Sequence, residues 1–178
     1  MLGAGGGFRV RGGDGAGWED YGSLTCQVVV LMRDIALILH VVAGLVGVVF
    51  GPLAVVVTLR VRRLNWAGEI FHWAVALICL TALVMVPYDW GRLWVFWPLS
   101  IAAYLFVWLG QRAAESTGEL WYRGVLRGYG GSWIALWTAV LVVNVAGRPW
   151  SWPLPIVLGG AGIEWFSARG GRRFAGQP

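Results

Sequence analysis

Long apolar runs separated by short charged segments dominate the chain. Four stretches of 19 to 25 residues contain no Asp, Glu or Arg, and they cover 35–59, 70–88, 93–111 and 128–147. A helix of about 20 apolar residues is long enough to cross a hydrocarbon core about 30 Å thick. The pattern therefore predicts four transmembrane helices at these positions.

A fifth helix is expected near the C-terminus. The apolar stretch from Pro149 to Trp165 is shorter than the other four and is interrupted at Glu164. We predict a short helix over Pro153–Ala168, with a re-entrant or interfacial segment that does not cross fully as the alternative. The predicted fold class is all-α, an integral membrane bundle of about five transmembrane helices over residues 32–168.

Composition narrows the functional class. Hydrophobic residues make up 58% of the 178 residues and charged residues 13%, whereas a soluble domain is nearer half apolar and a quarter charged. This balance excludes an ordinary soluble enzyme, a disordered chain and a nucleic-acid-binding domain. The lipid bilayer is therefore the predicted environment, and no nucleic acid is expected as a partner.

The positions of the arginines predict an orientation. In a five-helix topology, nine Arg fall in the two links and the tail on one side of the membrane, whereas the opposite short links carry two, Arg92 and Arg148. Cytoplasmic loops of membrane proteins carry the excess of basic residues. We therefore expect a multi-pass protein of the bacterial cytoplasmic (inner) membrane, with its C-terminus and an Arg-rich tail over 169–178 in the cytoplasm.

The first 31 residues differ from the rest. Nine of the first 22 are Gly, and such a segment buries too little apolar surface to offset its ordering entropy. Two interpretations remain open for residues 1–31. They form a Gly-rich flexible arm, which would bind a partner, or they reflect a mis-assigned start, with Met32 as a plausible true start.

Tryptophan is abundant, with 13 residues. Indole rings favour the headgroup level of the bilayer. We therefore interpret most of the Trp residues as interfacial anchors at or near the ends of predicted helices, namely Trp66, Trp73, Trp90, Trp94, Trp108, Trp121, Trp133, Trp150, Trp152 and Trp165.

The first predicted helix has a face of small residues. Ala43, Gly47 and Gly51 are spaced four apart, and Gly44 lies on the same side. Small residues at this spacing allow a neighbouring helix to approach closely. His40 shares this face, so we expect its side chain to point into the bundle rather than into lipid.

Four polar groups are expected inside the membrane, where such groups are costly and often functional. His40 and Asn144 are predicted at one depth near the outer surface, and His72 and Glu164 at another near the inner surface. We expect a contact between His72 and Glu164. A haem held by both histidines is disfavoured, because their depths differ by roughly 20 Å.

Each histidine on its own is a candidate cofactor ligand. Ala36 precedes His40 by four residues, and this spacing resembles the Ala-xxx-His element that holds pigment in bacterial antenna polypeptides. Haem or (bacterio)chlorophyll ligation is therefore considered at His40, with His72 as a second candidate. The plain alternative is a histidine satisfied within a helix interface. No catalytic residues are predicted, and no metal-ligand spacing or phosphate loop is present.

Several motifs together resemble a family of predicted bacterial multi-helix membrane proteins of unknown function. The first helix has His40 followed by small residues and then Gly51-Pro-Leu-Ala54, and the second begins with Gly68-Glu-Ile-Phe-His72. The fourth opens with Gly130-Gly-Ser-Trp-Ile-Ala-Leu-Trp-Thr-Ala139, and Pro155-Ile-Val-Leu-Gly159 follows. The resemblance covers about residues 35–165 and implies a helical bundle without an established activity.

Two functional hypotheses follow. The first is a non-catalytic accessory or structural subunit, packed with other membrane protein subunits in a larger assembly. The alternative is a membrane binder of a quinone, haem or chlorophyll-type pigment that uses His40 or His72. A transporter is disfavoured, because no inverted repeat is evident across five unequal helices.

Overall fold

The structure is a computed structural model that describes residues 16–61, 63–116, 121–145 and 153–174. The chain divides into two compact units, Met1–Ile35 and Ala36–Pro178. In the first unit the described residues form the opening of the first helix. The second unit contains the rest of that helix and the remaining helices, and it is the part described below.

All regular structure in the described residues is helical. The long helices are α1 (Ala16–Val61), α2 (Trp66–Met85), α4 (Phe96–Glu115), α5 (Trp121–Asn144) and α6 (Pro153–Phe174), and the short elements η1 (Val86–Asp89) and α3 (Trp90–Leu93) lie between α2 and α4. Each long helix overlaps one of the five stretches predicted from the apolar pattern. The all-α membrane bundle is therefore confirmed.

Among the described residues, three helices are long and apolar enough to cross a membrane, over Gln27–Val61, Trp66–Tyr88 and Trp121–Val142. Neither α4 nor α6 is in this set. Gln111 and Arg112 lie within α4, and Glu164 and Arg169 lie within α6, so each loses apolar character towards its C-terminal end. The five predicted helices are present, and three of them meet the criteria for crossing.

The helices extend beyond their predicted boundaries towards both ends of the chain. Residues 16–31 are helical, where we expected a flexible arm, because the apolar run Leu24–Met32 continues into α1 without a helix breaker. Residues 1–15 of that arm lie outside the described residues. At the other end α6 extends to Phe174, into the predicted tail, and 175–178 are likewise outside the described residues.

The start of α2 is fixed by its N-cap. The Asn65 side-chain oxygen accepts hydrogen bonds from the backbone N–H groups of Ala67 and Gly68, which otherwise lack partners at a helix N-terminus. The Asn65 amide also donates to the Thr58 hydroxyl, 2.7 Å away near the end of α1. The cap therefore joins the first two helices of the bundle where the chain reverses direction.

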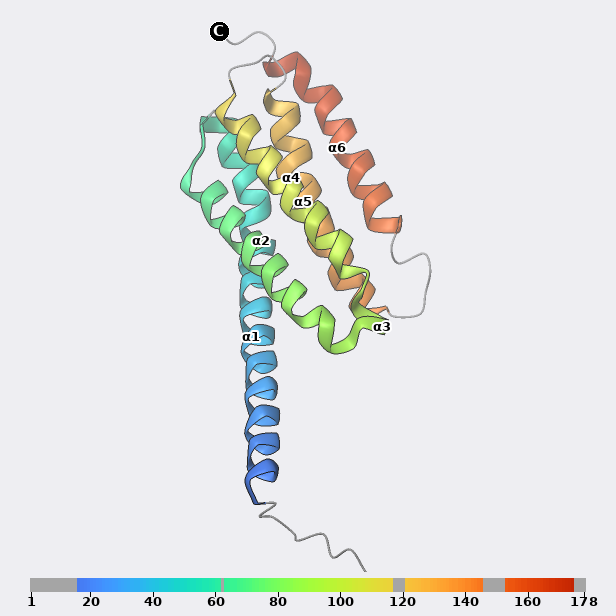
Figure 1. The fold of residues 1–178 in the computed structure, drawn as a ribbon. Helices are drawn as coiled ribbons and strands as arrows, with labels where there is room; N and C mark the ends of the chain where they lie inside the picture. The colour runs from blue at the N-terminus through green and yellow to red at the C-terminus, as the bar shows by residue number, and fades with distance from the viewer. Residues whose placement is uncertain (1–15, 62, 117–120, 146–152, 175–178) are drawn as a thin grey trace, which may run out of the picture. The chain divides into compact units, whose positions relative to one another are not determined.

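Helices α4 and α5 form the closest contact in the bundle and lie side by side (Figure 1). A Cβ at Gly128 would overlap the backbone of Gly110, and would lie 2.8 Å from the Phe106 carbonyl oxygen. Further along, Gly124 faces Ala113 and Gly131 faces the Phe106 ring. The opposite order of these contacts along the two helices shows that α4 and α5 are antiparallel.

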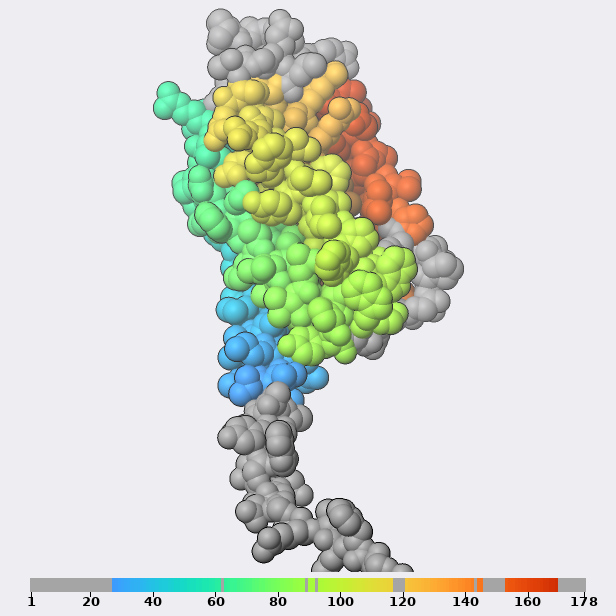
Figure 2. All heavy atoms as spheres, viewed as in Figure 1, coloured from blue at the N-terminus to red at the C-terminus, as the bar shows by residue number. Residues whose placement is uncertain are grey.

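The core is centred on the same contact. Large fully buried side chains from α2, α4 and α5 form its centre, namely Phe71, Val75, Val107, Val125 and Tyr129. The rings of Phe71 and Tyr129 meet edge to face, with centroids 5.9 Å apart, a favourable arrangement for aromatic pairs. On one face of the second unit, α4 side chains lie between those of α2 and those of α6 (Figure 2).

Helix α1 is joined to α5 at a proline. Pro52 has no N–H, so the Val48 carbonyl one turn earlier lacks its helical donor. The Trp133 indole Nε1–H donates to this carbonyl over 3.1 Å. The indole ring lies against Gly51, where a Cβ would overlap it. The Gly51-Pro52 pair therefore creates both the acceptor and the space that Trp133 occupies.

Trp133 thus differs from the interfacial anchor that we predicted. It lies in the middle of α5 and is only partly exposed, because α5 begins several residues earlier than the charge-free stretch indicated. Its hydrogen bond to the α1 backbone gives it a packing role.

We expect Trp133→Phe to lower the free energy of unfolding by about 1–3 kcal/mol, because the Val48 carbonyl is left without a donor. Pro52→Ala restores a backbone N–H to this carbonyl. In the Pro52→Ala background, the effect of Trp133→Phe should therefore fall by about 1 kcal/mol. Unfolding with sodium dodecyl sulfate in mixed micelles measures all four proteins of the cycle. Equal effects of Trp133→Phe in the two backgrounds would contradict the assignment.

Candidate functional site

The first candidate residue, His40, is held by a hydrogen bond. Its Nδ1 atom lies 2.9 Å from the Thr81 hydroxyl oxygen on α2. The Thr81 hydroxyl is also 2.8 Å from the Leu77 carbonyl oxygen and 3.0 Å from that of Ile78. A threonine hydroxyl has one proton and two lone pairs. With its proton directed at these carbonyls, the Thr81 oxygen accepts from Nδ1–H of His40, which leaves Nε2 as an acceptor.

His40 lines an apolar cavity of about 520 Å³, hereafter the His40 cavity. Four elements contribute most of its wall. They are α1 through Leu37, Val41, Gly44, Leu45 and Val48, α2 through Ile78, Ala82 and Met85, α4 through Phe96, and α5 through Leu136, Ala139, Val140 and Asn144, with Val86 and Leu93 between α2 and α4. His40 and Asn144 are the polar side chains among the lining residues.

The small-residue face of α1 explains both the packing and the cavity. Ala43 is buried, and a Cβ at Gly47 would lie 3.0 Å from Leu136 and 3.4 Å from Ile78. Gly47 and Gly51 therefore allow close contact with α2 and α5. Gly44 is different, because no atom lies within 4 Å of the position its Cβ would take. The missing side chain of Gly44 leaves part of the cavity open.

Asn144 lies in the same cavity wall as His40, but its side chain is engaged locally. Its amide Nδ2 donates to the Val140 carbonyl one turn earlier, over 2.8 Å. The side chain is exposed, and its Oδ1 atom and second N–H are left for other partners. The structure therefore brings His40 and Asn144 to one cavity without a hydrogen bond between them.

His72 lies elsewhere on α2. It precedes Thr81 by nine residues, which corresponds to about 14 Å along the helix, so the two histidines lie at different depths in the bundle. The His72 ring is 5.6 Å from the Tyr104 ring and 5.8 Å from that of Trp73. Its Nδ1 atom is buried and has no hydrogen-bond partner among the described residues.

The predicted contact between His72 and Glu164 is not formed. Both carboxylate oxygens of Glu164 bind the Arg127 guanidinium, with N–O distances of 2.8 to 3.0 Å. Arg127 lies on α5, and α5 is the helix that packs against α6. We had assigned Arg127 to a cytoplasmic link because it bounds the apolar stretch. Helix α5 begins at Trp121 instead, so Arg127 is within reach of Glu164.

Two residues that the sequence analysis missed are therefore central to the polar contacts. Thr81 occurs in an apolar helix and carries no charge, so only its position beside His40 reveals its role. Arg127 was counted for orientation alone. Arg127 lies directly before an apolar run, and this position does not indicate that it pairs with a residue 37 positions later in the chain.

The chemistry available at the His40 cavity is limited. No group of three or more His, Cys, Asp or Glu side chains that would hold a metal ion occurs in the part of the chain that the structure describes. The cavity offers one imidazole acceptor and one amide in apolar surroundings. This set suits the binding of one apolar molecule through a single polar group.

The corrected ion pair can be tested with two double-mutant cycles. We expect Arg127→Gln and Glu164→Gln to show a coupling free energy of about 0.5–1 kcal/mol in unfolding, the range of exposed ion pairs. The matched cycle of His72→Gln with Glu164→Gln should give a coupling near zero. A larger coupling for the histidine cycle than for the arginine cycle would restore the pair predicted from sequence.

The chain is similar to a known bacterial protein. It is 33% identical over 107 residues to a UPF0060 membrane protein of Janthinobacterium sp. (strain Marseille), and the match covers 94% of that protein and 53% of this chain. No model of a protein family matches the chain. No solved structure matches it either. The identity and the coverage of the relative, together with the helical membrane fold, show that the chain belongs to the UPF0060 membrane protein family.

Proposed function

We propose that this membrane protein binds one small apolar molecule in the His40 cavity, with the Nε2 atom of His40 as its polar anchor. The observation that carries the proposal is the hydrogen bond between His40 Nδ1 and the Thr81 hydroxyl, beside an apolar cavity of about 520 Å³. Ligand pockets in proteins have volumes of about 300–1,000 Å³ and few polar groups that fix orientation.

The ligand class follows from the chemistry of Nε2. With its proton on Nδ1, a neutral imidazole presents a lone pair at Nε2 and no donor. It accepts a hydrogen bond from a hydroxyl group, as in the reduced form of a quinone, or ligates the metal of a haem or chlorophyll-type ring. Histidines that ligate metals donate their other ring N–H to a fixed partner, and Thr81 supplies such a partner.

The space for a ring lies beside Gly44. We expected Ala36, four residues before His40, to leave this space. Ala36 is 8% exposed and does not line the cavity, whereas Gly44 lies four residues after His40 and is open. A flat ring at Nε2 would therefore extend towards Gly44. His40 lines this cavity and His72 does not, which favours His40 as the anchor.

The accessory-subunit hypothesis is less favoured by the contacts of α1. Its support was the glycine-faced helices, together with the Trp residues at helix ends, the short links and the scarcity of catalytic groups. In the second unit, Gly47 and Gly51 of the small-residue face on α1 are occupied by side chains of the same chain. The cavity is a more specific observation than the exposed apolar side chains, which lipid alone would cover. Co-purification of other membrane subunits is therefore one outcome of the test described below.

We also propose that the protein lies in the bacterial inner membrane with the Arg-rich end of the bundle in the cytoplasm. Support comes from the helix ends. Arg60 is in the last turn of α1 and Arg112 in the last turn of α4, while Arg123 and Arg127 are near the start of α5. This arrangement follows the positive-inside rule and directs the end of α6 into the cytoplasm.

The ligand test uses the full chain purified in a mild detergent. We expect the absorption spectrum or the mass spectrum of an organic extract to reveal one bound small molecule. His40→Leu and Gly44→Leu should each reduce its occupancy about tenfold, because they remove the anchor or fill the cavity. Gly162→Leu is the matched control, since Gly162 on α6 also has open space at its Cβ position.

For a purified chain without a bound molecule, titration with haem and with a short-chain hydroquinone gives the answer. The proposal predicts binding of one of them that depends on His40 and Gly44 but not on Gly162. Absence of binding in all of these measurements would refute it. Co-purification of a stoichiometric partner protein in that case would support the subunit hypothesis instead.

A further inference from the structure

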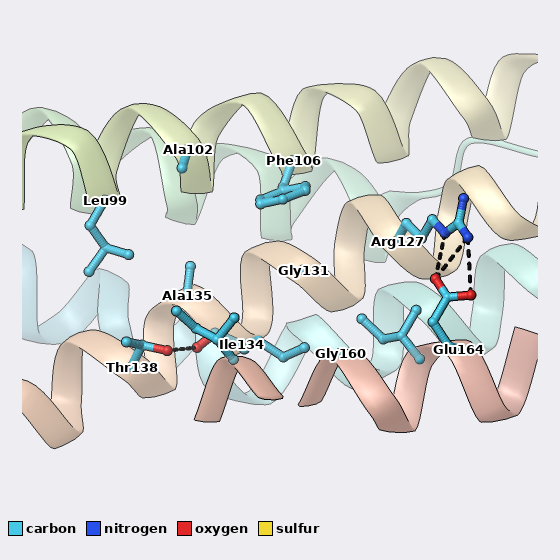
Figure 3. Close-up of a pocket in the computed structure, with 12 residues that line it drawn as sticks. Leu99, Ala102, Phe106, Arg127, Gly131, Ile134, Ala135, Thr138, Gly160 and Glu164 are labelled. Atoms are coloured by element: carbon cyan, nitrogen blue, oxygen red, sulfur yellow. Dashed lines mark hydrogen bonds and ion pairs between the residues drawn. The ribbon is translucent and has the colours of Figure 1, made fainter. Parts of the chain in front are cut away.

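A second hollow lies between α4, α5 and α6, and its lining shares no residue with that of the His40 cavity. It has a volume of about 390 Å³ and its wall is mostly apolar, with Leu99, Ala102 and Phe106 from α4, Gly131, Ile134, Ala135 and Thr138 from α5, and Ile156, Gly160 and Ile163 from α6. We call it the α4–α5–α6 groove. Arg127 and Glu164 complete its lining and lie together at one end (Figure 3).

Glycines shape this groove in two ways. A Cβ at Gly130 would lie 3.0 Å from Ile163, and one at Gly159 would lie 2.5 Å from Ile134, so both glycines bring α5 and α6 into contact. Gly160 has no atom within 4 Å of its Cβ position. The helices α5 and α6 are therefore closely packed at Gly130 and Gly159, whereas the groove has open space at Gly160.

The charged end carries both signs. The Nε and Nη2 atoms of Arg127 bind the two carboxylate oxygens of Glu164. The Arg127 side chain is 56% exposed and that of Glu164 is 60% exposed. A guanidinium has five N–H donors and a carboxylate has about four acceptor positions, so each group has capacity left after the pair forms. A molecule with adjacent negative and positive groups can therefore bind both.

The pair also lies within reach of a lipid headgroup. Arg127 is six residues after Trp121, where the candidate span of α5 begins, so its backbone is about 9 Å inside the span. Long arginine side chains extend from such positions towards the interface. One residue after Glu164, the Trp165 ring is covered by the Arg169 guanidinium at 3.9 Å. On α4, Arg112 lies 5.3 Å from the Trp108 ring. Trp and Arg residues of this kind mark the membrane interface.

We propose that the α4–α5–α6 groove binds a zwitterionic phospholipid of the phosphatidylethanolamine class. Its phosphate binds Arg127, its ammonium group donates to Glu164, and one acyl chain lies along Leu99, Phe106 and Ile156. A lipid with only a negative headgroup meets repulsion from Glu164. A choline headgroup has the same net charge but no N–H to donate. Ethanolamine therefore fits both charged side chains best.

The test reconstitutes the full chain into nanodiscs with equal parts of dioleoyl phosphatidylethanolamine, phosphatidylglycerol and phosphatidylcholine. Native mass spectrometry then measures the lipids retained after release. We expect the wild type to retain phosphatidylethanolamine about tenfold over the other two, because two charge-assisted hydrogen bonds depend on its headgroup. Glu164→Gln should abolish this preference and increase retention of phosphatidylglycerol, and Arg127→Gln should reduce retention of all three lipids.

Two further variants separate the groove from general effects. Gly160→Leu fills the groove without an overlap and should lower retention while helical content, measured by circular dichroism, stays constant. Arg112→Gln removes an exposed arginine outside the groove and should retain lipid as the wild type does. Equal retention of the three lipids by the wild type would overturn the proposal. Unchanged retention in Gly160→Leu, or a loss as large in Arg112→Gln as in Arg127→Gln, would also overturn it.

Discussion

The hydrogen bond from Trp133 to the Val48 carbonyl is the interaction on which the candidate site depends. Pro52 removes the ordinary donor to this carbonyl, and a bilayer has no water to replace it. The indole of α5 therefore has to approach α1, and Gly51 leaves the space for it. His40 lies about two helical turns before Val48 on α1, where its side chain contacts Thr81 of α2 and lines the cavity.

Several polar side chains of the bundle have a hydrogen-bond or ion-pair partner on their own helix or on a neighbouring one. Thr81 binds His40, Val140 receives the Asn144 amide, and Arg127 binds Glu164. Three buried atoms remain without a partner in the described residues, on His72, Tyr129 and Ser132. An orphaned buried polar atom is unfavourable. Ordered water is the usual partner for such atoms.

The sequence predicted the fold better than the contacts. Charge-free runs located four of the five long helices, and a shorter apolar stretch interrupted by Glu164 located the fifth, because the cost of charges in lipid is large and acts on each residue separately. The orientation of the His40 side chain towards the neighbouring helix also followed from helical spacing. Pairing did not, because it depends on which helices become neighbours. Glu164 had to be placed beside α5, and the start of α5 at Trp121 was hidden by the arginines within its first two turns.

The two hollows have a common origin in glycine. Gly47, Gly110 and Gly128 allow neighbouring helices to approach closely. Gly44 and Gly160 are also helical glycines, but no atom lies within 4 Å of their Cβ positions. The same residue type thus forms the packed regions and the open ones, and sequence spacing alone does not tell them apart. At the His40 cavity the polar anchor beside the open glycine has a defined orientation, which is the central claim of the proposed function.

The most direct measurement of this claim is nitrogen-15 NMR of the His40 ring in the protein reconstituted in lipid. We expect a proton on Nδ1 and an unprotonated Nε2, with the Nδ1–H signal shifted when Thr81 is replaced by Val. A proton on Nε2, or a spectrum unaffected by Thr81→Val, would contradict the claim that Thr81 orients His40 towards a ligand.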